Sequence, residues 1–167
     1  PDKEITLEAN PDDLPLKKIQ AIASTPINRL SIGIQSFFDE DLQLMNRAHS
    51  AKEARRCIEM ATPYFDHITI DLLYGMPQMS NVRWKKNLQI AFDLKLNHLS
   101  CYALTVEPKT ALAHFIRTAQ HPPLNDAVAA QHFQTLVTAT VKAGFTHYEV
   151  CSFCLLYTSP SPRDGDE

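Results

Sequence analysis

The chain has few of the residues that mark the more specialised classes of protein. Its 167 residues include four glycines, four cysteines and one tryptophan, and its formal net charge is −3. Four cysteines do not suggest a disulfide scaffold, so a reducing, cytoplasmic compartment is the default. The small charge predicts no basic groove for nucleic acid. No apolar run reaches the roughly 20 residues of a membrane span, and no signal peptide is visible.

The remaining composition, 44% hydrophobic and 21% charged, suits one globular domain. Strand patterns alternate with helix patterns along the chain. Strands are predicted at residues 4–9, 29–36, 67–75, 97–108 and 147–153, and helices after Asn10 and over 39–45, 50–62, 80–94 and 125–144. Alternating elements of this kind predict an α/β fold, in which a parallel sheet curls into a full or partial (β/α) barrel.

Polar side chains follow the predicted strands at the ends where a parallel barrel carries its chemistry. The first four strands carry Glu8 and Asn10, Gln35 and Ser36, Asp71, and Thr105 and Glu107. Buried polar groups require partners. Internal hydrogen bonding would explain any one of these residues, whereas the set favours a ligand site on one rim of the sheet.

Five segments of the sequence resemble the motifs of one protein family. The strings "EITLEANPDDL", "NRLSIGIQSF", "LMNRAHS", "IDLLYGMPQ" and "LSCYALTVEPKT" follow one another along residues 4–153. In order and spacing the chain resembles radical S-adenosylmethionine (SAM) proteins similar to oxygen-independent coproporphyrinogen III oxidase. Within that group, "TLEANP", "NRAHS" and "LTVEP" are more similar to the haem chaperone branch.

The resemblance implies a SAM-binding surface. Glu8, Gln35, Arg47 and Asp71 match family residues that contact SAM, and Thr105 lies near a fifth contact whose residue type differs between branches. Carboxylates suit ribose hydroxyls and an ammonium group, and an arginine suits a carboxylate. Without the family match, Arg47 could equally be a solvated charge at a helix end.

The family's cluster-binding segment is missing from the sequence. The resemblance implies a [4Fe–4S] cluster held by a C-x3-C-x2-C loop after the first barrel strand, and a glycine-rich second strand directly before "EITLEANP", and neither pattern occurs here. Cys57 and Cys101 lie in a helix and a strand pattern and are interpreted as small buried residues. The expectation is therefore a partial barrel, truncated at both ends, that begins at the third barrel strand and is itself inactive.

The last residues raise a separate question, because Cys151 and Cys154 have the spacing of a redox dithiol or half a zinc site. The string "CLLYTSPSPRD" matches, residue for residue, the translation of a transposase adapter used in sequencing libraries. We therefore predict a native part over 1–153 and a non-native tail over 154–167, which leaves the cysteine pair an accident of the junction.

Three functions stay open. The leading one is part of a haem chaperone that binds SAM and haem and delivers haem to acceptor proteins. The second is the coproporphyrinogen III oxidase itself, which converts propionate side chains to vinyl groups. The third is a nonfunctional truncated product. The seven histidines, His49 among them, are interpreted as structural rather than as haem ligands.

Overall fold

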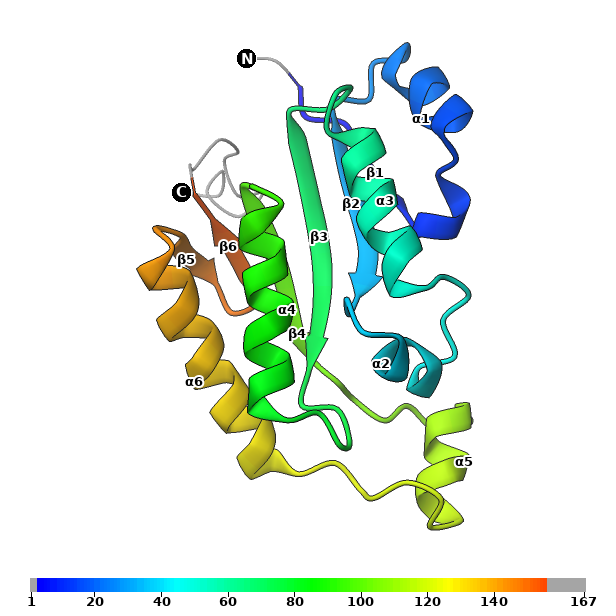
Figure 1. Cartoon of the computed structure of the whole chain (residues 1–167), viewed down its shortest axis with the longest axis vertical. Coiled ribbons are helices and arrows are strands. Elements are labelled where there is room, and N and C mark those ends of the chain that lie inside the picture. The colour runs from blue at the N-terminus through cyan, green and yellow to red at the C-terminus, as the bar shows by residue number, and fades with distance from the viewer. Residues whose placement is uncertain (1–2, 156–167) are drawn as a thin grey trace, which may run out of the picture.

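The computed structural model describes residues 3–155, which form one six-stranded sheet with helices packed on one of its faces (Figure 1). The strand order is β1-β2-β3-β4-β6-β5. Four strands, β1 (Thr6–Ala9), β2 (Arg29–Gln35), β3 (His67–Tyr74) and β4 (His98–Ala103), pair in parallel. The predicted parallel α/β arrangement is therefore confirmed for these four strands. The sheet is a partial barrel that does not close on itself.

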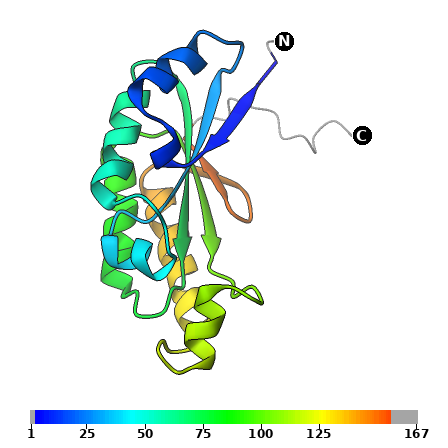
Figure 2. The same cartoon turned by 90° about the vertical axis from the view of Figure 1, so that its right-hand side faces the viewer.

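Helices connect the parallel strands, as right-handed crossovers require. Between these strands lie α1 (Leu16–Ala23), α2 (Asp39–Leu44), α3 (Ala51–Ala61) and α4 (Asn81–Asp93), and a 3-10 turn, η1 (Pro11–Asp13), follows β1. Two more helices, α5 (Ala111–Arg117) and α6 (Asp126–Lys142), come after β4. Seen edge-on, the longer helices lie on one side of the sheet and leave the other side open (Figure 2). We call this second side the open face.

Local sequence signals set the helix ends. Ser50 and Glu53 form the predicted capping box, in which the Ser50 backbone N–H donates to Glu53 Oε2 at 2.7 Å. Ser80 caps α4 by accepting from the Arg83 backbone N–H at 3.1 Å. Gly144 follows α6 with a φ of +85°, a conformation that glycine adopts at little cost. The predicted helix boundaries hold to within a few residues.

The hydrophobic core lies between the sheet and its helices. Alternate residues of β2 and β3, such as Ile32, Ile34, Ile70 and Leu72, are fully buried there. They pack with helix residues including Ile58 of α3 in one cluster. Because strand side chains alternate, the other residues of β2 and β3 point to the open face.

The carboxyl-terminal part differs from the sequence prediction. The single strand expected at 147–153 is two short antiparallel strands, β5 (Thr146–Glu149) and β6 (Ser152–Cys154), joined at the exposed Val150. β6 pairs antiparallel with β4, and the Cys101 backbone N–H donates to the Cys151 carbonyl at 2.8 Å. β6 lies beside β4, and β5 lies on the far side of β6, so the chain must reverse direction between β5 and β6.

The predicted tail boundary falls inside this hairpin. Cys154 is buried in β6 opposite His98, and the Leu155 backbone N–H donates to the Asn97 carbonyl at 2.9 Å. These two residues, which the sequence assigned to the non-native tail, therefore pair with His98 and Asn97 at the start of β4. Residues 156–167 lie outside the described residues. The fourth strand also ends at Ala103, earlier than predicted, and α5 occupies part of the loop expected after it.

Candidate functional site on the open face of the sheet

Parallel pairing brings polar residues from separate strands into rows on the open face. Glu8 of β1 lies opposite Ser31 of β2, which lies opposite Thr69 of β3. Two residues further along, Asp71 of β3 lies opposite Ser100 of β4. Paired residues of neighbouring strands share a face. Glu8, near the end of the edge strand β1, and Asp71, in the middle of β3, therefore occupy the same face in adjacent rows.

Gly33 forms the floor of a polar cluster on this face. A Cβ atom at Gly33 would lie 3.1 Å from both Asn10 Oδ1 and Gln35 Nε2 and 3.4 Å from Arg47 Nη2. Arg47 donates a hydrogen bond to Asn10 Oδ1. Glycine gives these three side-chain ends the room that they share, and a Cβ atom here would require them to shift by a few tenths of an ångström. Two sequence-predicted site residues, Gln35 and Arg47, are thus brought together by a residue that the sequence reasoning did not single out.

Gln35 has an unusual backbone and an unsatisfied side chain. It ends β2 with a φ of +62°, in the left-handed region, at the point where the register with β3 shifts. Its Oε1 atom is buried and has no hydrogen-bond partner within residues 3–155. A buried acceptor without a partner costs about 1–3 kcal/mol. This atom is therefore a natural position for a donor group of a ligand.

Asp71 is held in an environment that opposes its charge. Burial raises its pKa to about 6, the Glu8 carboxylate adds to this rise, and the neighbouring Ser100 hydroxyl acts in the opposite direction. Raised carboxylate pKa values of this kind are common where a site is built to meet a ligand. Glu8 itself is exposed.

Thr105 stands apart from this cluster. It lies beyond the end of β4, is exposed, and its hydroxyl donates to Glu107 Oε1 at 3.4 Å. The structure thus gathers Gln35 and Arg47 around Gly33 and sets Glu8 beside Asp71, while Thr105 remains in a separate loop. Asn10, which the sequence placed among the polar residues of this ligand site but not among the expected SAM contacts, lies in the cluster beside Arg47.

Residues 1–109 match the model of the Radical SAM superfamily. The chain belongs to this superfamily. It is 38% identical over 153 residues to radical S-adenosyl methionine domain-containing protein 1, mitochondrial, of Mus musculus, covering 91% of this chain and 35% of that protein. It is 31% identical to heme chaperone HemW of Bacillus subtilis, covering 90% and 40%. The radical SAM chain thus spans about a third to two fifths of these relatives.

A solved structure gives the same result for the fold. Coproporphyrinogen III oxidase (HemN) of Escherichia coli, a radical SAM enzyme, superposes with a TM-score of 0.80 at 24% identity, over 92% of this chain and 35% of that one. The resemblance to radical SAM proteins of the HemN and HemW type is therefore confirmed. The sheet described here corresponds to part of that fold.

The cysteines of this radical SAM chain do not fit a [4Fe–4S] cluster. All four are free thiols, with Cys57 in α3 and Cys101 in β4 both buried. Burial raises the pKa of Cys57 to about 11 and the pKa of Cys101 further, which disfavours the thiolates that iron needs. Over residues 3–155, no three His, Cys, Asp or Glu side chains gather as a metal site requires.

The buried histidines have structural contacts. His49 Nε2 lies 3.1 Å from the Ile34 carbonyl, and His132 Nδ1 accepts from the Gly75 backbone N–H at 3.1 Å. His98 hydrogen-bonds the Tyr148 hydroxyl. No helix in the described part of the chain is both long and apolar enough to cross a membrane.

Proposed function

We propose that the open face binds SAM as part of a haem chaperone-like radical SAM protein. Two observations carry the proposal: the side chains of Asn10, Gln35 and Arg47 approach one another around Gly33, and the buried Gln35 Oε1 atom has no hydrogen-bond partner among residues 3–155. SAM carries donors and acceptors for each of these groups. When bound in the whole protein, it would supply the adenosyl group used in radical chemistry.

Each residue of the proposed site would bind a group of SAM that complements its own charge or hydrogen-bonding capacity. Arg47 offers a guanidinium to the carboxylate of the methionine part, which is the pairing that guanidinium geometry favours. Glu8 and Asp71 offer carboxylates to hydroxyl or ammonium donors, and Gln35 Oε1 accepts one further hydrogen bond. Ionised Asp71 is a stronger acceptor than the protonated form and carries the charge that attracts an ammonium group. With its pKa near 6, we therefore expect SAM affinity to fall as the pH is lowered through 6. Thr105 would add a contact from the loop after β4.

Residues 3–155 offer no set of three metal-binding side chains for a cluster, so no reaction step is assigned to them. Identities of 31–38% to the chaperone and its mitochondrial relatives support the chaperone over the oxidase, because the likeness to HemN, at 24% identity, supports the fold alone. Haem and acceptor proteins would be partners of the whole protein. A cytoplasmic location is proposed from the free thiols. Cell fractionation is its test, since three relatives are named mitochondrial.

Equilibrium dialysis with radiolabelled SAM tests the site. The variants Glu8→Gln and Arg47→Met should each weaken binding by about tenfold, which corresponds to about 1.4 kcal/mol. Glu59→Gln and Arg56→Met make the same chemical changes on exposed positions of α3 and should leave affinity unchanged. Absence of SAM binding by the folded chain, or equal affinities across all four variants, would overturn the proposal.

A further inference from the structure

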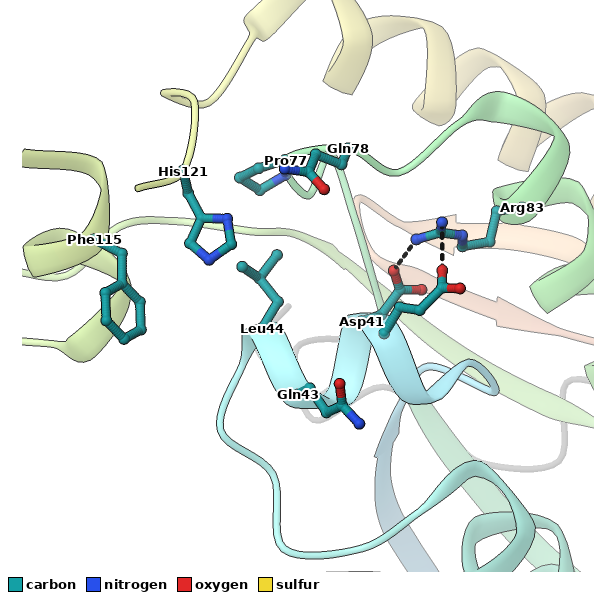
Figure 3. A pocket seen from close by; sticks show the side chains of 9 residues that line it. Asp41, Gln43, Leu44, Pro77, Gln78, Arg83, Phe115 and His121 are labelled. Carbon is teal, nitrogen blue, oxygen red and sulfur yellow. Dashed lines mark hydrogen bonds and ion pairs between the residues drawn. The ribbon is translucent and has the colours of Figure 1, made fainter. Parts of the chain in front are cut away.

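A buried polar network lies directly behind the Gly33 cluster, between the end of β2 and α4. Its members are Ser36, Asp41, Arg83 and Asn87, and we call them the β2–α4 network. Ser36, Asp41 and Asn87 are between 0% and 1% exposed. The Ser36 hydroxyl donates to Asp41 Oδ2 at 2.6 Å. Arg83 Nη1 donates to the other oxygen, Asp41 Oδ1, at 2.8 Å (Figure 3). Together the two bonds satisfy both oxygens of a buried carboxylate.

The network fixes the backbone that leaves the site. Asn87 Oδ1 accepts from the Phe37 backbone N–H at 2.7 Å, and Asn87 Nδ2 donates to the Ser36 hydroxyl at 3.2 Å. Ser36 directly follows Gln35, whose φ of +62° is unfavourable for a residue other than glycine. Such a backbone conformation persists only when contacts with the surrounding structure stabilise it. Asn87 and Ser36 therefore hold the residues next to the strained position.

The β2–α4 network is also connected to Arg47, through α2. Asp41 lies in α2, and the carbonyl of the next residue, Leu42, accepts from the Arg47 backbone N–H at 2.9 Å. Leu42 is 1% exposed, so this end of α2 is fixed by packing as well. The segment between Gln35 and Arg47 is thus tied to α4 in its middle and carries one site residue at each end.

We propose that the β2–α4 network is a positioning device that holds Gln35 and Arg47 in their binding orientation over Gly33. Stability alone is a poor reason to bury an ion pair, because apolar side chains of similar volume do as well or better. Directional bonds are needed where one backbone conformation must be selected from several. The proposal rests on the proposed function only in taking Gln35 and Arg47 as ligand-binding residues.

Ser36→Ala tests this with a small change, since it removes one hydroxyl from the network. We expect the Gln35 side-chain amide signals, assigned by their loss in Gln35→Glu, to move in the ¹H–¹⁵N spectrum of the ligand-free chain. SAM affinity should fall at least about tenfold. Ile58→Val is the matched control, because it loosens the core at α3 and should lower the melting temperature without moving either readout.

Arg83 supplies a second, independent test. Its side chain is 25% exposed and lines a cavity of about 550 Å³ with Gln78 and Phe115, so a shorter or apolar side chain can be accommodated (Figure 3). Arg83→Met should reproduce the Ser36→Ala effects, and Arg83→Lys, which keeps a cation facing Asp41, should restore most of the affinity. Lys86→Met removes a charge from an exposed position of the same helix and should have no effect.

The readouts separate the two proposals. If the unchanged chain binds no SAM, the proposed function fails, and the Gln35 amide signals still decide the positioning role. If Ser36→Ala and Arg83→Met lower the melting temperature while the Gln35 signals stay in place, the network serves stability alone and the positioning role is refuted.

Discussion

Replacing Asp71 by asparagine should stabilise the chain at neutral pH. The pKa of Asp71 rises from an ordinary 3.8 to about 6, chiefly through burial. A raised folded-state pKa means that the folded chain loses stability as the pH climbs from about 4 through 6, and the loss is complete above 6. A shift of about 2 units corresponds to about 3 kcal/mol. Because Asp71 is only partly buried, about 1–2 kcal/mol is the reasonable expectation.

The assay is thermal unfolding of Asp71→Asn and the unchanged chain across pH 4 to 8. At pH 7.5 the variant should melt roughly 5 °C higher, given about 2–4 °C per kcal/mol for a chain of this size. The gap should close as the pH falls toward 4. Only the difference between the two proteins is informative, because His98 contributes in the opposite direction. Burial lowers the pKa of His98 to about 4, so its contribution to stability grows with pH over the same range.

An exposed carboxylate provides the control. Asp66→Asn should leave the melting curve unchanged at every pH, because Asp66 lies at the surface between α3 and β3. A gap between Asp71→Asn and the unchanged chain that stays constant from pH 4 to 8 would refute the reasoning. The same variant should bind SAM more weakly, so the carboxylate would be retained for binding at a cost in stability.

Three further predictions concern the cluster, the carboxyl terminus and the sheet edge. Anaerobic reconstitution with iron and sulfide should give no stoichiometric [4Fe–4S] cluster, because the chain has no C-x3-C-x2-C motif; Mössbauer spectra with one cluster per chain would contradict this. Truncation after Leu155 should leave the melting temperature within error, whereas truncation after Phe153 should lower it by removing the residues that pair with His98 and Asn97; equal curves would show that these pairings contribute nothing. The β1 edge, with Ile5 exposed beside it, should promote association, and Ile5→Lys should reduce it, as measured by size-exclusion chromatography with light scattering; a monomer without the substitution would rule this out.

The sequence by itself predicted most of the secondary structure and the family. Apolar strand patterns at 29–36 and 67–75 and the capping box at Ser50 are local signals, and the structure follows them closely. It also pointed to Gln35, Arg47, Glu8 and Asp71, because strand-end polar residues and the family motifs agree. Local patterns are sufficient here since strand alternation and helix capping depend on neighbours only a few residues away.

Tertiary structure decided the rest. Whether residues 147–153 form one strand or a hairpin depends on which segment pairs with β4, and local pattern does not specify that partner. The role of Gly33 depends on Asn10 and Arg47, which are 23 and 14 residues away in sequence and meet only because β1 pairs with β2. The β2–α4 network likewise joins Ser36 to Asn87 across 51 positions. The sequence identifies residues able to bind, and the register of the sheet determines which of them meet.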